Sequence, residues 1–168
     1  MTDRKALVAR AFIEAIPHAR AIGMRLDEIG DGLAVISMPY DPRLVGDPET
    51  GVIHGGAVSA LMDTCGGAAV MSHPRAPSAT ATIDLRIDYM RPARPGDRIT
   101  ARAECYHVTR SVAFVRATAH DADQDRPVAT ATGTFTFDAA KGDRGLARAC
   151  APSLSRSSRN AATPRCNR

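Results

Sequence analysis

Several residue types are scarce in this 168-residue chain, and each shortage excludes a class of protein. There is no Trp, and aromatic residues make up only 4% of the chain. No apolar run approaches the roughly 18 residues of a membrane-spanning helix. The N-terminus, MTDRKALVARAFIEAI, mixes charged and apolar residues, unlike a signal peptide. With 168 residues, of which 44% are hydrophobic, the chain is expected to form one ordinary domain. Because it shows neither a membrane-spanning run nor a signal peptide, we expect the protein to be cytoplasmic.

Metal-ligand patterns are also missing. The four cysteines, at positions 65, 105, 150 and 166, form no CxxC pair and no Cys/His ligand spacing. The histidines at 73, 107 and 120 show no ligand spacing either. We therefore predict no metal and no cofactor, and we interpret Cys65 and Cys105 as small buried thiols.

Positive charge is concentrated at one end of the chain. Residues 139–168 carry a net charge of +6, which leaves −2 for residues 1–138. The segment is rich in Ser, Arg, Ala and Pro without apolar periodicity, so we predict a folded domain at 1–138 and a disordered basic tail at 139–168. The tail has neither interleaved aromatics nor a fold signature, so we predict no nucleic-acid binding.

Periodicity and turn residues predict an α+β fold. The expected order is a helix at 4–16 stopped by Pro17, strands at 23–29 and 33–38, a Pro/Gly-rich loop at 39–51, a long apolar helix at about 55–71, and four strands at about 80–90, 98–108, 111–120 and 127–137. RPGD at 94–97 suits a type II turn. In the strand at 80–90, Ile83, Leu85, Ile87 and Tyr89 alternate with polar residues and predict one half-buried face. Such an antiparallel sheet is expected to curl around the long helix.

The long helix carries a single carboxylate. From Gly51 to Ser72 there is no Lys, Arg or Glu, and Asp63 is the only acid. A carboxylate buried without a partner is costly, and desolvation moves such a group toward the range of a general base. The alternative is an Asp63 paired with Arg86 or with a backbone N–H of a neighbouring strand. The same helix is rich in small residues, and the pair Gly66-Gly67 implies close packing or a local break.

These residues together resemble a known family. The order of loop, HGG, apolar helix and Asp, followed by IDYMRPARPGD and a strand starting TRSVAF, is similar to the hotdog-fold acyl-CoA thioesterases of the phenylacetate-pathway (PaaI-like) type. The likeness covers about residues 20–137. It implies an antiparallel sheet wrapped around a long central helix, a homodimer or a tetramer of two dimers, and hydrolysis of an acyl-CoA to free acid and CoA.

The resemblance assigns roles to the start and the middle of the helix. The amides of Gly55 and Gly56 are expected to hold the thioester oxyanion, because the first helix N–H groups lack internal partners and favour negative charge. Alternatively, the two glycines only ease the loop into the helix. Asp63 is expected to attack the thioester or to activate a water. Eight residues separate Gly55 from Asp63, about 12 Å along a helix, so we predict that Asp63 of one subunit faces the glycines of the other.

Further residues carry weaker expectations. His54 is expected to orient the loop through its ring nitrogens, to bind substrate, or to act as a base, and we favour the first. Thr82 matches a position where a small hydroxyl holds the attacking water, or it is an ordinary strand threonine. Arg91, Arg110 and Ser111, at strand ends, are expected to bind the CoA phosphates.

One departure from the family pattern concerns an Asn that often precedes HGG. The chain has no Asn before Asn160, and Asp47 lies in that region. If Asp47 approached Asp63, the two carboxylates would repel each other. Two other functions stay open: a hotdog dehydratase using His54 with Asp63, and a non-catalytic acyl-CoA-binding protein.

Overall fold

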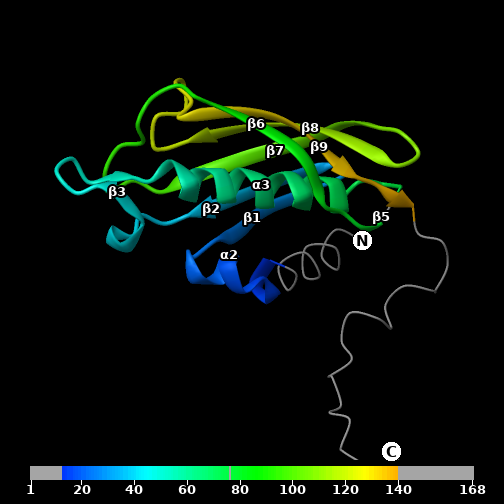
Figure 1. Cartoon of the computed structure of the whole chain (residues 1–168), viewed down its shortest axis with the longest axis horizontal. Coiled ribbons are helices and arrows are strands. Elements are labelled where there is room, and N and C mark those ends of the chain that lie inside the picture. Colours follow the sequence, from blue (N-terminus) through cyan, green and yellow to red (C-terminus); the bar gives the residue numbers. More distant parts are fainter. Residues whose placement is uncertain (1–12, 76, 140–168) are drawn as a thin grey trace, which may run out of the picture.

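The computed structural model describes residues 13–75 and 77–139, so most of the predicted helix at 4–16 and nearly all of the tail lie outside the described residues. One antiparallel sheet packs along one long helix, α3 (Gly55–Met71) (Figure 1). The strand order is β1 (Arg25–Gly30), β2 (Leu33–Met38), β7 (Ile99–Val108), β8 (Val112–His120), β9 (Ala129–Thr136) and β6 (Thr82–Tyr89). The α+β arrangement is therefore confirmed.

Most predicted boundaries hold within two residues, with two corrections near the N-terminus. Pro17 does not simply stop a helix, because it opens the short helix α2 (Pro17–Ala21), where a missing N–H costs nothing. The segment 39–51 is not all loop, because η1 (Pro42–Leu44) and β3 (Val45–Asp47) lie in it and β3 pairs with β4 (Val52–Ile53). A second small pair joins β5 (Pro77–Ala79) to β10 (Asp138–Ala139). Gly96 has a φ of +89°, as the predicted type II turn requires.

The core forms where α3 lies against the sheet. Leu61, Met62 and Cys65 are fully buried on the inner side of the helix. The Cys65 thiol donates to the carbonyl oxygens of Ala34 and Ala101, on β2 and β7. Burial raises the pKa of the Cys65 thiol to about 12, so this cysteine is an inert core residue, as expected. Among the described residues, no helix is long and apolar enough to cross a membrane.

Small residues allow α3 to approach the sheet closely. A Cβ atom added to Gly66 would lie 2.8 Å from the ring tip of Phe135, a β9 residue that is only 1% exposed. At Gly67 the nearest atom to an added Cβ is Thr80 Cγ2, at 4.0 Å. Close packing therefore explains Gly66, and no break interrupts the helix at either glycine.

Strand β6 departs from the expected half-buried pattern. Ile83 and Tyr89 are 57% and 51% exposed, and only Leu85 and Ile87 of the apolar set are partly buried. The reason is position, because β6 is an outer strand of the sheet and is paired with β9 alone among the described residues. The pairing register also shifts between Thr82 and Asp84, which indicates a β-bulge next to Ile83.

Two neighbouring glycine substitutions should have opposite effects on stability. Gly66→Ala should lower the free energy of unfolding by about 1–3 kcal/mol, because the buried Phe135 ring has no room to move. Gly67→Ala should raise it by up to about 1 kcal/mol, because only the gain in helix propensity applies there. Urea unfolding followed by circular dichroism measures both. Changes of the same sign in the free energy of unfolding of the two variants would contradict this packing.

Candidate active site

His54 fixes the start of α3. It is the N-cap residue, and its ring Nδ1 accepts a hydrogen bond from the Gly56 amide at 2.9 Å. Its backbone N–H donates to the Leu44 carbonyl at 2.8 Å, which ties the cap to η1. Gly46 of β3 crosses so closely that an added Cβ would lie 2.8 Å from His54 Cα. His54 thus occupies the capping position that the sequence analysis favoured.

The cap makes the two glycine amides unequal. The Gly56 N–H is bonded to His54 Nδ1, and the Ala57 N–H donates to the His54 carbonyl at 2.9 Å. In the described part of the chain the Gly55 N–H has no acceptor, while the Gly55 carbonyl accepts from the Tyr89 hydroxyl at 2.7 Å. One amide at the positive end of α3 is therefore free to bind an anion.

Asp63 lies in the middle of α3 and is partly exposed rather than buried. Its Oδ1 accepts a hydrogen bond from the Thr82 hydroxyl at 2.6 Å. The alternative pairing with Arg86 does not occur, because Arg86 donates to Asp88 at 3.0 Å. Asp63 and Thr82, which the sequence suggested separately, are thus brought together, with one carboxylate oxygen bonded to the hydroxyl.

The two parts of the candidate site lie at opposite ends of β6. Tyr89 at the end of β6 contacts Gly55, whereas Thr82 at its beginning contacts Asp63. The seven residue steps from Thr82 to Tyr89 span about 23 Å of strand. The corresponding stretch of α3 spans about 12 Å. Within one protomer, the Gly55 amide and the Asp63 carboxylate therefore cannot act on the same carbonyl group.

Asp47, in the region where relatives often carry Asn, has a local role. Its carboxylate accepts hydrogen bonds from the Thr50 hydroxyl at 2.5 Å and from the Glu49 amide at 3.1 Å. The bond from Thr50, with help from the Glu49 amide, lowers the pKa of Asp47. Asp47 thus stabilises the turn before HGG through these local contacts.

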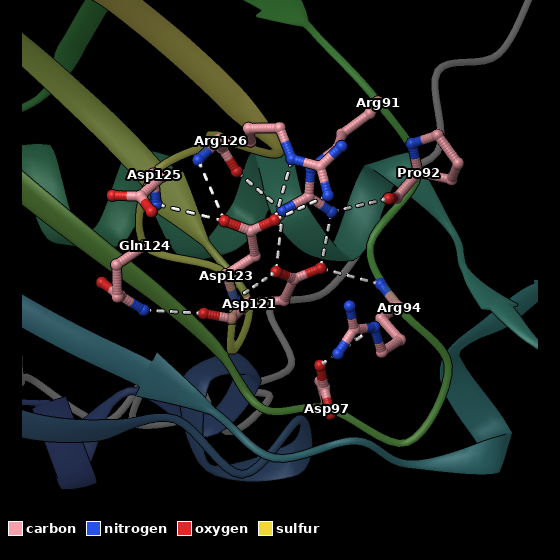
Figure 2. Close-up of polar contacts among 9 residues, drawn as sticks. All are labelled: Arg91, Pro92, Arg94, Asp97, Asp121, Asp123, Gln124, Asp125 and Arg126. Carbon is pink, nitrogen blue, oxygen red and sulfur yellow. Dashed lines mark hydrogen bonds and ion pairs between the residues drawn. The ribbon is translucent and has the colours of Figure 1, made fainter.

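Arg91 has a structural partner in place of the expected CoA phosphate (Figure 2). Its guanidinium donates to both oxygens of Asp121, at 2.6 and 2.7 Å, and to the carbonyl of Arg126 at 2.7 Å. The Asp121 side chain is only 1% exposed. The hydrogen bonds from Arg91, aided by the Arg94 amide and opposed by burial, hold the pKa of Asp121 well below its usual value. This pair anchors the segment after β6 to the loop after β8.

Arg110 and Ser111 lie at the exposed tip of the β7–β8 hairpin. The Ser111 carbonyl accepts from the Phe137 amide at 2.8 Å, which holds the tip beside the end of β9. Thr82 pairs with Phe135 of β9, so the tip is at the same end of the sheet as Thr82 and Asp63. Among the described residues, Arg110 makes no salt bridge, and no cluster of three His, Cys, Asp or Glu residues is suited to a metal ion.

A cavity of about 310 Å³ lies beside the start of α3. Ile22, Leu44 and Ala57 contribute apolar surface to it, and His54 and Gly56 line it as well. The lining thus mixes apolar residues with the polar side chains of His18, Arg43 and His54, beside the capped N-terminus of α3.

Comparison with known proteins identifies the family. Residues 50–128 match the family model described as the thioesterase superfamily. The medium/long-chain acyl-CoA thioesterase YigI of Salmonella typhimurium is 31% identical over 142 residues, which cover 77% of this chain and 90% of YigI. The chain belongs to the thioesterase superfamily. The acyl-coenzyme A thioesterase PaaI of Escherichia coli is 31% identical over 99 residues, 59% of this chain and 67% of PaaI.

Solved structures agree with this assignment. The E. coli PaaI protein from the phenylacetic acid degradation operon superposes with a TM-score of 0.72 at 25% identity, covering 82% of this chain and 96% of PaaI. A protein of Pseudomonas aeruginosa has a TM-score of 0.71 at 36% identity, covering 79% and 98% of the two chains. The PaaI-like resemblance and the hotdog fold are confirmed, and the protein is a thioester hydrolase.

Sequence reasoning missed two contacts near the site. Asp121 is the first residue of the polar stretch DADQDR, between the strands predicted at 111–120 and 127–137, and nothing in the sequence separates it from Asp123 or Asp125. Tyr89 was assigned to an apolar strand face, although its hydroxyl reaches the start of α3. The signal that was available is its position at the end of β6, just before the RPARPGD segment.

The Asp121 ion pair should make stability depend on pH in a defined window. The pKa of Asp121 is depressed in the folded protein, so its contribution is present above the ordinary value of 3.8 and is lost as pH falls toward the folded pKa. Asp121→Asn should therefore lower the urea midpoint at pH 7, and the gap to wild type should narrow below pH 4. Asp125→Asn, in the same loop, is the control and should show little change. A difference in urea midpoint between wild type and Asp121→Asn that stays constant down to pH 2 would contradict this role of Asp121.

Proposed function

We propose that the protein is an acyl-CoA thioesterase that hydrolyses a CoA thioester to the free carboxylic acid and CoA, with the Asp63 carboxylate as general base or nucleophile. The observation that carries the proposal is the pair of Asp63 and Thr82. Asp63 is the only carboxylate on α3, it is partly exposed, and the Thr82 hydroxyl orients its Oδ1. Family membership supplies the reaction class, and this pair supplies the reactive group.

The proposed chemistry needs three groups around one carbonyl. The Gly55 N–H, at the positive end of α3, stabilises the oxyanion as the carbonyl carbon becomes tetrahedral. The Asp63 carboxylate, bonded to Thr82 through one oxygen, takes a proton from a water that attacks this carbon. The C–S bond then breaks, and the proton passes to the departing CoA thiolate. Alternatively Asp63 attacks first, and water hydrolyses the resulting anhydride to the same products.

A two-fold homodimer through β6 would complete this site. β6 is an outer strand that exposes Ile83, Tyr89 and Met90, and outer strands readily pair with another chain. A two-fold axis near the middle of β6 would set it antiparallel to the partner's β6. The Tyr89 end of one strand would then lie beside the Thr82 end of the other. Gly55 would face the partner's Asp63, and a tetramer of two such dimers would leave the site unchanged.

The substrate parts can be assigned to two regions. Arg110 and Ser111 lie at the Asp63 end of the sheet, and we assign the CoA phosphates to this hairpin tip. Arg91 is left out of the assignment, because both of its terminal nitrogens are bonded to Asp121. The acyl group is assigned to the cavity beside Gly56, whose apolar residues include Ile22 and Leu44.

The competing functions are less well supported. A hotdog dehydratase using His54 as a base needs a free imidazole nitrogen at the reacting carbon. In this structure His54 Nδ1 caps the helix by accepting from the Gly56 amide. A pure acyl-CoA-binding protein has no use for a carboxylate held by a hydroxyl near the middle of α3.

Replacing Asp63 should remove hydrolysis without unfolding the protein. Thiol release should be measured with phenylacetyl-, benzoyl- and C4–C12 acyl-CoAs. Wild type should hydrolyse part of this panel, and Asp63→Ala should lower kcat by about 10²–10⁴ because the proton acceptor or nucleophile is lost. Asp27→Asn, on β1, is the control and should keep wild-type rates. Binding of CoA without any hydrolysis by wild type would favour the dehydratase or the binding protein.

A mixed dimer tests whether the site is shared between subunits. Gly55→Pro removes the free N–H, and proline suits the first position of a helix. Its Cβ would lie 3.3 Å from Tyr89 Cζ, but this ring is half exposed and can move outward, so the variant should fold and be inactive. Refolding equal amounts of Gly55→Pro and Asp63→Ala together should restore about a quarter of wild-type activity, because half the dimers then have one intact site of two. Each variant refolded alone is the control. A mixture as inactive as its components would place the whole site within one subunit.

A further inference from the structure

Two hydroxyl groups converge on the carbonyl oxygen of Gly55. The Tyr89 Oη lies 2.7 Å from this oxygen, and the Ser59 Oγ lies 3.2 Å from it. The two hydroxyl oxygens are also 2.6 Å apart. Ser59 comes from the next turn of α3 and Tyr89 from the end of β6, so this cluster joins the helix start to the strand.

The hydroxyl protons of Ser59 and Tyr89 can be arranged as a chain of hydrogen bonds in two ways. Three contacts share the two hydroxyl protons. If Tyr89 donates to the Gly55 carbonyl, Ser59 donates to Tyr89; if Ser59 donates to the carbonyl, Tyr89 donates to Ser59. In both arrangements the Gly55 carbonyl keeps a hydroxyl donor, and mutual polarisation strengthens the chain of bonds.

The Tyr89 ring also fills the space where a side chain at residue 55 would lie. A Cβ atom on Gly55 would be 3.3 Å from both Cζ and Oη of Tyr89. The Gly55 carbonyl and the Gly56 amide form one peptide unit, which is thus held by Tyr89 at its oxygen and by His54 at its N–H. The preceding unit, which carries the Gly55 N–H, is held through the His54 carbonyl by the Ala57 amide. Of the amides of Gly55, Gly56 and Ala57, only that of Gly55 has no acceptor among the described residues.

Such fixing matters because glycine is the most flexible residue. Two successive glycines at a helix start allow close approach of a substrate but do not themselves hold the amide in one direction. An oxyanion donor is effective when its direction is set before the charge develops, since no reorganisation is then needed in the transition state. A group that orients the donor therefore acts on the transition state more than on substrate binding.

We propose that Tyr89, together with Ser59, is a positioning residue of the thioesterase reaction. By holding the Gly55–Gly56 peptide unit and the Cα side of Gly55, it fixes the residue whose free amide faces the thioester oxygen. This inference rests on the proposed function, because it assigns the oxyanion to the Gly55 amide. Tyr89 does not exchange protons with the substrate in this role. It acts through the Gly55 carbonyl, from the edge strand that also carries Thr82.

The proposal is tested with Tyr89→Phe, which keeps the ring against Gly55 and removes only the hydroxyl. We expect kcat to fall about five- to tenfold and KM to change less than twofold, the size of one lost hydrogen bond felt in the transition state. Tyr106→Phe is the matched control, because Tyr106 is 52% exposed on β7 and its hydroxyl has no hydrogen bond within the described residues. This control should keep the wild-type kcat and KM.

Ser59→Ala and the double variant show whether the two hydroxyls act as one unit. Ser59→Ala should lower kcat by less than Tyr89→Phe, because Tyr89 can still donate to the Gly55 carbonyl. The double variant should lose less than the product of the two single effects, since both hydroxyls serve the same oxygen. Multiplicative effects would show that they act independently and would overturn the shared role.

A readout without substrate separates this inference from the proposed function. In ¹H–¹⁵N spectra, Tyr89→Phe should shift or broaden the Gly55 and Gly56 amide signals, whereas Tyr106→Phe should leave them unchanged. An active wild type with an unchanged kcat in Tyr89→Phe would overturn the positioning role alone. A wild type inactive on every acyl-CoA would overturn the proposed function, and with it the role of Tyr89 in hydrolysis, even if the amide signals moved.

Discussion

The close packing of α3 against the sheet is the constraint on which the rest of the structure depends. Gly66 presses against the ring of Phe135, and Cys65 reaches the carbonyls of two strands. Because the helix cannot shift away from the sheet, its two functional positions have fixed heights above it. Gly55 comes to lie beside the end of β6, and Asp63 beside its beginning. A helix that packed loosely would not hold either contact.

This arrangement explains why one strand bonds to both functional positions. β6 supplies Thr82 to the acid and Tyr89 to the glycine, although the two residues are about 23 Å apart along the strand. In the proposed mechanism, a single protomer therefore holds two half-sites at opposite ends of its outer strand. An antiparallel two-fold pairing is the operation that superposes opposite ends of a strand, so the same edge that exposes Ile83 and Met90 would also assemble the site.

Local patterns in the sequence predicted most of the fold. Alternation and turn residues placed the strands, and the apolar run placed α3 with its true ends at 55 and 71. The errors concern neighbours that are distant in sequence. Alternation in β6 predicted a half-buried face, but burial depends on whether another strand lies alongside, which periodicity does not encode. Likewise, the sequence did not reveal the ion pair of Arg91 with Asp121, because Asp121 lies thirty residues away in a loop of several acids.

The two carboxylates that define this protein show how environment assigns chemistry to one residue type. Asp121 is enclosed by an arginine and two backbone amides, so all of its hydrogen-bonding capacity serves the fold. Asp63 receives one hydroxyl on one oxygen and stays partly exposed. A carboxylate saturated by donors is a poor proton acceptor, because each donor stabilises its charged form. In the proposed mechanism, the sparse coordination of Asp63 leaves one carboxylate oxygen available to the substrate or to water. The rich coordination of Asp121 holds the loop after β8 to the segment after β6.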